Sequence, residues 1–370
     1  MTPRRCVSRR ARATWHRCVL VAAVGLLPGC THGEPFTPGT YTPGRPFSPA
    51  PLSRLTFNSG NDRTPAWLPD GSGIVYSFER LERRDRDRCL GLLPPTGGSR
   101  RLTVCNRAPA ADDTTDVLEW PSAAPDGRLA YTHLRGRAGV IAPPDGGALV
   151  LASLGAPETT REVVVFPFSF PGRRGHDAAA QIRWASDSFL FYVAELQFIV
   201  RNPLAGITDT LVTGLEIEQV DLRGGGAAVA VSTIPGTAFA TSLAFALGVI
   251  YYTIAGDARV LRRVLASGDT SVVHDFGAAG IARDVQVAGD RLVAVVGGNV
   301  SFVTDPGTGL SYQQDRGGYL HVVSLTTGAA TILSDTTFRY RHPALSPDGG
   351  RVVAEVMNTG RAELWLLDIR

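Results

Sequence analysis

A pair of short strand-like runs joined by a two-residue turn recurs along this chain, and it constrains the fold more than any other feature. The clearest copies read "PAWLPDGSGIVYSFE", "WPSAAPDGRLAYTHL", "IRWASDSFLFYVAE" and "HPALSPDGGRVVAEV", at residues 65–79, 120–134, 182–195 and 342–356. Asp-Gly is a strong hairpin signal because both residues tolerate a positive φ. Two weaker copies cover residues 242–256 and 284–298. The repeat therefore predicts an all-β chain of hairpins.

A second predicted hairpin follows each copy except the last. These outer hairpins cover residues 89–105, 138–153, 217–232, 259–276 and 319–334. Four strands in each repeat of about 40–60 residues are the pattern of a β-propeller. The repeats predict six blades, which begin near residues 65, 120, 182, 242, 284 and 343. Seven blades would result if residues 217–232 formed a blade of their own.

The last repeat stops halfway, at "ELWLLDIR" in residues 363–370. Residues 52–58, "LSRLTFN", resemble the outermost strand of the first blade, "SRRLTVCN", yet they precede every blade. We therefore expect residues 55–58 to supply the missing fourth strand of the last blade and to close the ring. Closure would leave no open sheet edge between the ends of the chain. Burial of Leu55 and Phe57 there would contribute about 1.5–3 kcal/mol each.

The pattern P-x-W-x-P-D-G-x-x-I-x-Y-S at residues 65–77 resembles the repeats of the TolB-like, WD-repeat-like propeller family. The resemblance extends over residues 52–370 and implies a six-bladed propeller. The chain departs from TolB because it lacks the α/β domain that precedes the propeller there. The role of TolB in the Tol–Pal envelope system therefore does not transfer to this chain.

The N-terminal residues 1–29 are predicted to be an export signal. An Arg-rich start is followed by the eleven-residue apolar run "CVLVAAVGLLP", which is shorter than the roughly 20 residues that a membrane-spanning helix needs. The following "LPGC" resembles a bacterial lipobox, which implies lipid attachment at Cys30; the alternative is an ordinary cleavage site beside a free Cys. In lipoproteins, Thr31 rather than Asp after that Cys implies the outer membrane. Residues 30–52 are rich in Pro and Gly and predict a tether, and residues 53–370 form the propeller.

Charge excludes several classes of function. The formal net charge is +3, and residues 1–29 hold six Arg and no acidic residue, so the exported chain carries 3 − 6 = −3. We therefore expect no basic field for nucleic acid. The chain contains no Lys, which excludes Schiff-base chemistry and a Walker-type phosphate loop.

Cys89 and Cys105 lie at equal distances from Gly97, the middle of their predicted hairpin. They would therefore face each other on adjacent strands of an exported protein, which predicts a disulfide. The alternative is a pair of reduced, buried thiols.

The predicted entrances of the innermost strands concentrate charge at one mouth of the central channel. They carry Asp62, Arg63, Glu119, Arg183, Arg283 and Arg341. Four Arg at one mouth could hold an acidic peptide or a carboxylate; the alternative is a set of solvated or internally paired charges.

The sequence predicts no catalytic residue, metal site or cofactor. The His residues fall at registers that do not converge, and a G-x-S-x-G nucleophile elbow is missing. We expect a monomeric, membrane-anchored envelope lipoprotein whose propeller binds an envelope protein or an acidic peptide. The alternative is a saccharide lyase or hydrolase with its site in the channel. Three inserted segments, residues 156–180, 196–214 and 299–317, are either binding loops or surface decoration.

Overall fold

The computed structural model divides the chain into Met1–Phe47 and Ser48–Arg370. The structure describes residues 52–57, 60–79, 87–98, 100, 102–105, 114–137, 146–167, 175–202, 207–224, 229–298, 300–304, 311–315, 317–334, 338–357 and 361–369. The predicted signal, Cys30 and the tether up to residue 51 lie outside this part. Within these ranges, no helix is long and apolar enough to cross a bilayer.

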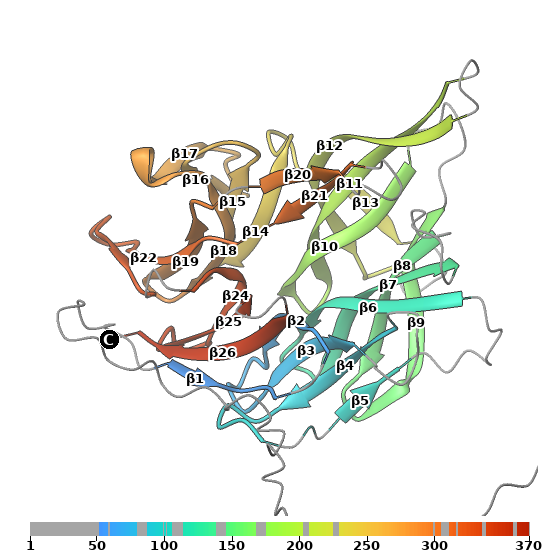
Figure 1. Ribbon diagram of the computed structural model, residues 1–370, viewed down its shortest axis with the longest axis horizontal. Helices are drawn as coiled ribbons and strands as arrows, with labels where there is room; N and C mark the ends of the chain where they lie inside the picture. Colours follow the sequence, from blue (N-terminus) through green and yellow to red (C-terminus); the bar gives the residue numbers. More distant parts are fainter. Residues whose placement is uncertain are drawn as a thin grey trace, which may run out of the picture. The chain divides into compact units, whose positions relative to one another are not determined.

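The described chain is built from antiparallel sheets (Figure 1). Four sheets have four strands each. One sheet has the order β1 (Leu52–Arg54), β26 (Ala362–Asp368), β25 (Arg351–Met357), β24 (Tyr340–Leu345). A second contains β10 (Gly175–Ser186), β11 (Phe189–Asn202), β12 (Ile207–Asp221) and β13 (Ala230–Thr233). A third contains β14 (Ala240–Ala246), β15 (Val249–Ile254), β16 (Arg259–Val264) and β17 (Thr270–Asp275). The fourth contains β18 (Ala282–Ala288), β19 (Arg291–Val296), β22 (Tyr319–Ser324) and β23 (Ala330–Ile332).

The remaining strands form one eight-stranded sheet and one two-stranded ribbon. The large sheet contains β2 (Asp62–Trp67), β3 (Ile74–Glu79), β4 (Arg88–Leu93), β5 (Leu102–Val104), β6 (Thr114–Ala123), β7 (Arg128–Arg137), β8 (Gly146–Ser153) and β9 (Ala156–Pro167). The ribbon pairs β20 (Val300–Thr304) with β21 (Ser311–Asp315). A short 3₁₀ helix, η1 (Gly277–Ala279), follows β17.

The sheets have a β-propeller arrangement. The innermost strands contact one another in the cyclic order β2, β6, β10, β14, β18, β24 and back to β2. All the predicted inner hairpins are present as antiparallel pairs. Hydrophobic side chains fill the space between neighbouring sheets, as in the cluster of Leu55, Trp67, Tyr76, Val353 and Leu364 between the first and last repeats.

The two ends of the described chain pair with each other, as expected. Strand β1 runs antiparallel to β26, with Ser53 opposite Leu366 (Figure 1). The expected position of this strand was wrong, because β1 is Leu52–Arg54 rather than residues 55–58. Leu55 extends the contact through its N–H, which donates to the carbonyl of Leu364 (2.8 Å).

Burial of the two apolar side chains in this segment differs from expectation. Leu55 is 2% exposed, as predicted, whereas Phe57 is 67% exposed. The regular strand has ended before Phe57, and Thr56 instead turns inward to accept the Leu364 N–H at 3.0 Å. Phe57 lies on the surface, where the Arg54 guanidinium is 4.6 Å from its ring centroid.

Most outer hairpins lie where they were predicted. Strands β4–β5, β16–β17 and β22–β23 are paired, and β12–β13 join the sheet of β10 and β11 instead of forming a separate blade. The prediction for residues 138–153 was wrong: β8 pairs with β9 across a turn at Leu154 and Gly155. Gly146, the second residue of the predicted Asp-Gly turn, therefore begins β8.

The three inserted segments are largely strands rather than loops. Residues 156–167 form β9, and residues 175–180 already belong to β10. Residues 196–214 lie mostly in β11 and β12, which extend as one long hairpin beyond the rest of their sheet (Figure 1). Residues 299–317 contain the β20–β21 ribbon. Runs such as "LQFIV" and "TDTLVT" are rich in β-branched and aromatic residues, which favours strand extension over a loop.

The same kind of tryptophan contact occurs at two junctions between neighbouring sheets. The indole N–H of Trp67 on β2 donates to the carbonyl of Ala344 on β24 (2.9 Å), and that of Trp184 on β10 donates to Ser122 on β6 (2.9 Å). An Arg covers each indole ring at a comparable distance: Arg351 at 5.0 Å over Trp67 and Arg128 at 4.7 Å over Trp184. Each buried indole therefore has both a hydrogen-bond acceptor and a cation, which stabilise these two junctions.

The predicted disulfide between Cys89 and Cys105 is present. It closes a loop with a sequence separation of 16. For a loop of this length, we expect the Cys89→Ala, Cys105→Ala double variant to lose about 3 kcal/mol of unfolding free energy, measured by urea denaturation. Reduction of the wild type should have the same effect and should leave the double variant unchanged. Equal stability of oxidised and reduced wild type would contradict this expectation.

Candidate binding site in the central channel

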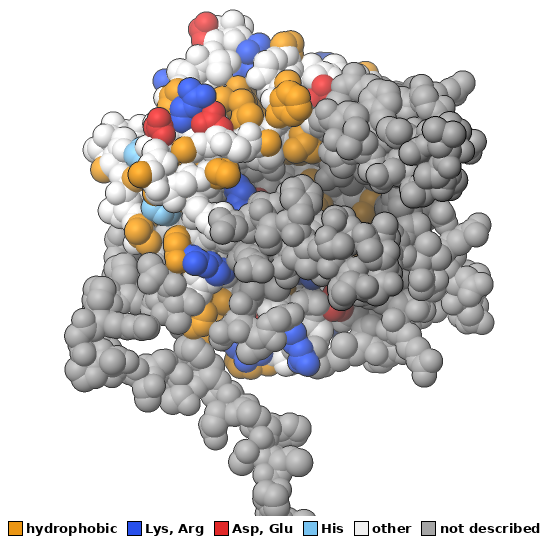
Figure 2. Space-filling view, turned by 45° about the horizontal axis from the view of Figure 1, so that its top comes forward, with side chains coloured by type: hydrophobic (Ala, Val, Ile, Leu, Met, Phe, Trp, Pro, Cys, Tyr) orange, Lys and Arg blue, Asp and Glu red, His pale blue; other side chains and the backbone are white. Residues whose placement is uncertain are grey.

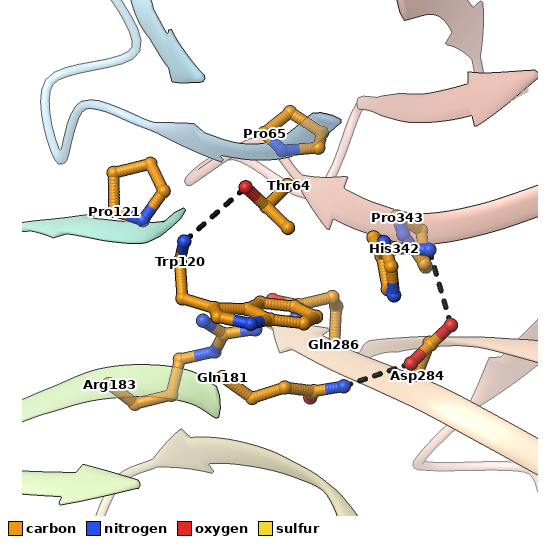
Figure 3. A pocket seen from close by; sticks show the side chains of 10 residues that line it. All are labelled: Thr64, Pro65, Trp120, Pro121, Gln181, Arg183, Asp284, Gln286, His342 and Pro343. Carbon is orange, nitrogen blue, oxygen red and sulfur yellow. Dashed lines mark hydrogen bonds between the residues drawn. The ribbon is translucent and has the colours of Figure 1, made fainter. Parts of the chain in front are cut away.

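The innermost strands share a β-bulge at one position. Their pairing with the next strand shifts register between Arg63 and Ala66, between Glu119 and Ser122, and between Arg341 and Ala344, with corresponding shifts in β10 and β18. Non-glycine residues at these bulges have a positive φ of 43° to 54°: Thr64, Trp120, Gln181, Asp284 and His342. A bulge re-aims side chains relative to the regular alternation. Here it directs five side chains, each from a different innermost strand, toward the channel (Figure 3).

The sequence carries a periodic signal for these residues. Each bulge residue lies six positions before the hairpin turn of its repeat, as Thr64 does before Asp70 and His342 before Asp348. In three repeats a Pro follows directly, at Pro65, Pro121 and Pro343. Alignment of the repeats on their turns would therefore have brought the bulge residues into one column.

The bulge side chains also join neighbouring sheets. Thr64 Oγ1 accepts the Trp120 backbone N–H (3.3 Å), and Asp284 Oδ2 accepts the His342 N–H (3.2 Å). In the same way, Gln181 Oε1 accepts the Leu243 N–H at 3.1 Å. At Trp120 and His342 the bulge exposes a backbone donor that the ladder does not satisfy, and a side chain from the neighbouring innermost strand accepts it.

Glu355 on β25 is the centre of a buried charge cluster. Its carboxylate accepts hydrogen bonds from Arg341 Nη2 (3.0 Å), His342 Nδ1 (2.6 Å) and the Thr64 N–H (2.6 Å). The side chain of Glu355 is completely buried. Burial alone would raise the pKa of Glu355, but the charge and hydrogen bond of His342, with the charges of Arg341 and Arg63, lower it. This Glu355 cluster (Glu355, Arg341, His342 and Thr64) therefore contains an ionised carboxylate with three donors.

The same contacts act on His342 in the opposite direction. Burial disfavours the charged imidazole, but the carboxylates of Glu355 and Asp284 raise the pKa of His342 above its ordinary value of 6.5. The imidazolium form is therefore favoured in the folded protein.

This shift predicts a pH dependence of stability. A His whose pKa is raised by folding stabilises fully below pH 6.5, and the stabilisation is lost as pH rises through the folded-state pKa. We expect the melting temperature of the wild type to fall above pH 6.5 more than that of His342→Gln. His321 is a matched control, because burial lowers its pKa. His321→Gln should therefore change the melting temperature at acidic pH and not above pH 6.5. Parallel profiles for wild type and His342→Gln would refute the expectation.

A small pocket lies where the bulge residues meet (Figure 3). A water-sized sphere can occupy about 10 Å³ of it, which is room for about one water molecule. We call it the channel pocket, and it is lined by Thr64, Pro65, Trp120, Pro121, Gln181, Arg183, Asp284, Gln286, His342 and Pro343. The Trp120 ring extends into its middle, 4.6 Å from the centroid of His342 in an edge-to-face arrangement.

The six predicted mouth residues lie in different surroundings. Only Arg183 of these six lines the channel pocket. Arg341 is bound to Glu355, and the charge of Arg63 acts on the same carboxylate. Arg283 donates to the carbonyl of Gly297 (3.2 Å), Glu119 forms an ion pair with Arg88, and Asp62 is 1% exposed. Their joint role as one binding surface stays a prediction.

Arg183 itself is partly buried. Its Nη1 donates to the carbonyl of Ile182 (2.7 Å), and its Nε is buried without a partner among the described residues. Burial lowers the pKa of Arg183 to about 10, against the opposing effect of Asp284. The guanidinium is therefore still charged at neutral pH. In the described ranges, no three His, Cys, Asp or Glu side chains lie close enough together to hold a metal ion.

Comparisons with known proteins show the fold. No family model matches the chain, and no curated protein sequence matches it. A gluconolactonase from Xanthomonas campestris is similar in structure, with 13% identity, a TM-score of 0.54, and coverage of 87% of this chain and 90% of that one. TolB from Acinetobacter baumannii has 16% identity and a TM-score of 0.48 over 84% of this chain, which spans 64% of the TolB chain. An oligogalacturonate lyase in complex with manganese has 13% identity and a TM-score of 0.45, with coverage of 87% and 93%.

Proposed function

We propose that the chain is a non-catalytic binding scaffold, a six-bladed propeller whose central channel holds a protein or peptide partner. The count of six is supported by the eight-stranded sheet, in which β4 and β6 are joined by a single parallel bridge between Arg88 and Val117. Strands β2–β5 and β6–β9 then form separate blades. The cyclic contacts of the innermost strands agree with this division.

The carboxylates of Asp284 and Glu355 already accept hydrogen bonds from protein groups, and this observation favours binding over catalysis. Asp284 accepts from Gln181 Nε2 (2.9 Å) and from the His342 N–H, and Glu355 accepts from three groups. A general base works best with a pKa near the operating pH and with a free lone pair. The lowered pKa of Glu355 and its three hydrogen bonds favour a structural role. A saccharide hydrolase would need a pair of free carboxylates, and a hydrolase or a lyase would need a larger cavity at this position.

The partner is proposed to be another protein rather than a nucleic acid. On the described part of the face in Figure 2, Arg and acidic side chains are interspersed with hydrophobic ones. Mixed polar and apolar surface of this kind is typical of protein contacts, whereas nucleic acid favours a continuous basic surface.

Photo-crosslinking inside the channel tests the scaffold function. A benzophenone amino acid in place of Arg283, a predicted mouth residue that does not line the channel pocket, is expected to capture a discrete partner in cells that express the full chain. The same group in place of Leu247, which is fully exposed on a hairpin turn, is the control. Identical products from both positions, or none from position 283 in a variant with the wild-type melting temperature, would contradict a binding role.

We further propose that the scaffold is an envelope lipoprotein of the outer membrane, held through Cys30 and the tether of residues 30–52. The lipobox-like sequence of residues 27–30 supports this proposal. Cys30→Ser should move the protein from the membrane fraction to the soluble fraction, while Cys6→Ser should leave it in the membrane. Retention of Cys30→Ser in the membrane would contradict lipid attachment at this residue.

A further inference from the structure

Some hydrogen-bond donors of the channel pocket have no partner among the described residues. Arg183 keeps its buried Nε without a partner among the described residues. The indole N–H of Trp120 and the amide of Gln286 make no hydrogen bond within the described chain, and both residues line the same pocket. In Figure 3, the Arg183 side chain extends from β10 toward Trp120, and Gln286 lies beside the same indole.

Two acceptor side chains of the pocket already bond to protein groups. Asp284 accepts from Gln181 through Oδ1 (2.9 Å) and from the His342 N–H through Oδ2 (3.2 Å). Gln181 Oε1 accepts from the Leu243 N–H (3.1 Å). The amide of Gln286 can offer a ligand either its oxygen or its nitrogen, whereas the Arg183 guanidinium and the Trp120 indole can only donate. A ligand that accepts would therefore satisfy these two donors.

The charged groups around the pocket also favour a ligand that accepts hydrogen bonds and carries negative charge. Arg183, Arg63, Arg341 and the imidazolium of His342 are opposed by the carboxylates of Asp284 and Glu355. This leaves an excess of positive charge around the pocket. A guanidinium binds a carboxylate through two parallel N–H donors, which gives both affinity and orientation.

We propose that the channel pocket binds one carboxylate group of a peptide, with Arg183, Trp120 and Gln286 as its donors. This inference rests on the proposed binding function and specifies its ligand. The small volume suits a single carboxylate at the tip of an acidic side chain or at a chain end. The rest of the peptide then lies outside the pocket, along the channel.

Indole NMR of the purified full chain tests the proposal. The chain contains five Trp, and the Trp120 indole signal is assigned by its loss in Trp120→Phe. Acetate is expected to shift the Trp120 signal in a saturable manner, and methylammonium is expected to leave it unchanged. N-acetyl-glutamic acid amide and N-acetyl-alanine offer a side-chain and a chain-end carboxylate respectively. The one that binds more tightly identifies the source of the carboxylate, and N-acetyl-alanine amide is the neutral control.

Two variants decide whether Arg183 carries the binding. Arg183→Gln should weaken acetate binding by about tenfold or more, because a hydrogen bond to a charged group is lost. Arg262→Gln is the matched control, since Arg262 lies on β16 and its Nε donates to Ser271 (2.9 Å). If Arg183→Gln does not fold, Gln286→Glu supplies the answer, because a second negative charge in the pocket should abolish the acetate shift.

The outcomes separate this inference from the proposed function. No saturable shift in the wild type, or an equal shift in Arg183→Gln or in Gln286→Glu, would overturn the carboxylate pocket. A discrete partner crosslinked from position 283 without any acetate response would overturn the pocket chemistry and leave the scaffold. An Arg183-dependent acetate response without a crosslinked partner would retain the pocket and contradict the scaffold.

Discussion

Replacement of Glu355 by Ala is expected to lower the free energy of unfolding by about 3–5 kcal/mol, because it leaves buried cations without their counter-charge. Arg341, His342 and the Thr64 N–H would all lose their acceptor at once. Thr64 belongs to β2, whereas the other members belong to the last sheet, so the loss should loosen the junction between the two ends of the propeller. Urea denaturation of the purified protein measures the effect.

Asp221→Ala is the control for this prediction. Asp221 also pairs with an Arg, at 2.5 Å from Arg223, but its side chain is 26% exposed and that of Arg223 is 65% exposed. Exposed ion pairs of this kind contribute about 0–1 kcal/mol. Equal losses for Glu355→Ala and Asp221→Ala would show that burial does not determine the cost.

Leu55→Ala is expected to cost about 2–5 kcal/mol, because truncation of a buried Leu leaves a cavity. Leu55 is 2% exposed and packs with Trp67, Val353 and Leu364, which come from both ends of the chain. The variant should also associate more readily, because loss of the β1 contacts exposes the edge of β26. Thermal unfolding and size-exclusion chromatography measure the two effects.

Phe57→Ala provides the control within the same segment. Because Phe57 is 67% exposed, its removal should change stability by no more than about 0.5 kcal/mol. A loss as large as that of Leu55→Ala would mean that Phe57 is buried against the propeller, contrary to the structure.

The parts of the fold that local signals determine could be predicted from the sequence. Strand-like runs on either side of an Asp-Gly turn specify the inner hairpins, and the two strands of each hairpin lie close together in the sequence. The similarity of residues 52–58 to residues 99–106 was enough to join the two ends. The failure at Phe57 has a tertiary cause: the Thr56 side chain, rather than the next apolar residue, binds the Leu364 N–H.

The binding site depends on contacts between residues far apart in the sequence. The bulge positions can be aligned on the turns, but their convergence requires the ring of sheets. The outer hairpin of residues 146–167 was misplaced because an Asp-Gly pair does not by itself mark a hairpin turn: Gly146 begins β8. One local signal was present and unused: Glu355 is the single charged residue in the apolar run "VVAEVM", and an acid buried in such a strand requires cationic partners.

The pairing of β1 with β26 has a mechanical consequence. Any tension applied through the residues before Leu52 reaches β1 first, and only three residues of this strand face β26. The remaining sheets would carry force only after this short pair had separated. A pulling experiment on the N-terminus should therefore register an early, low-force rupture that lengthens the chain slightly, followed by the unravelling of the other sheets.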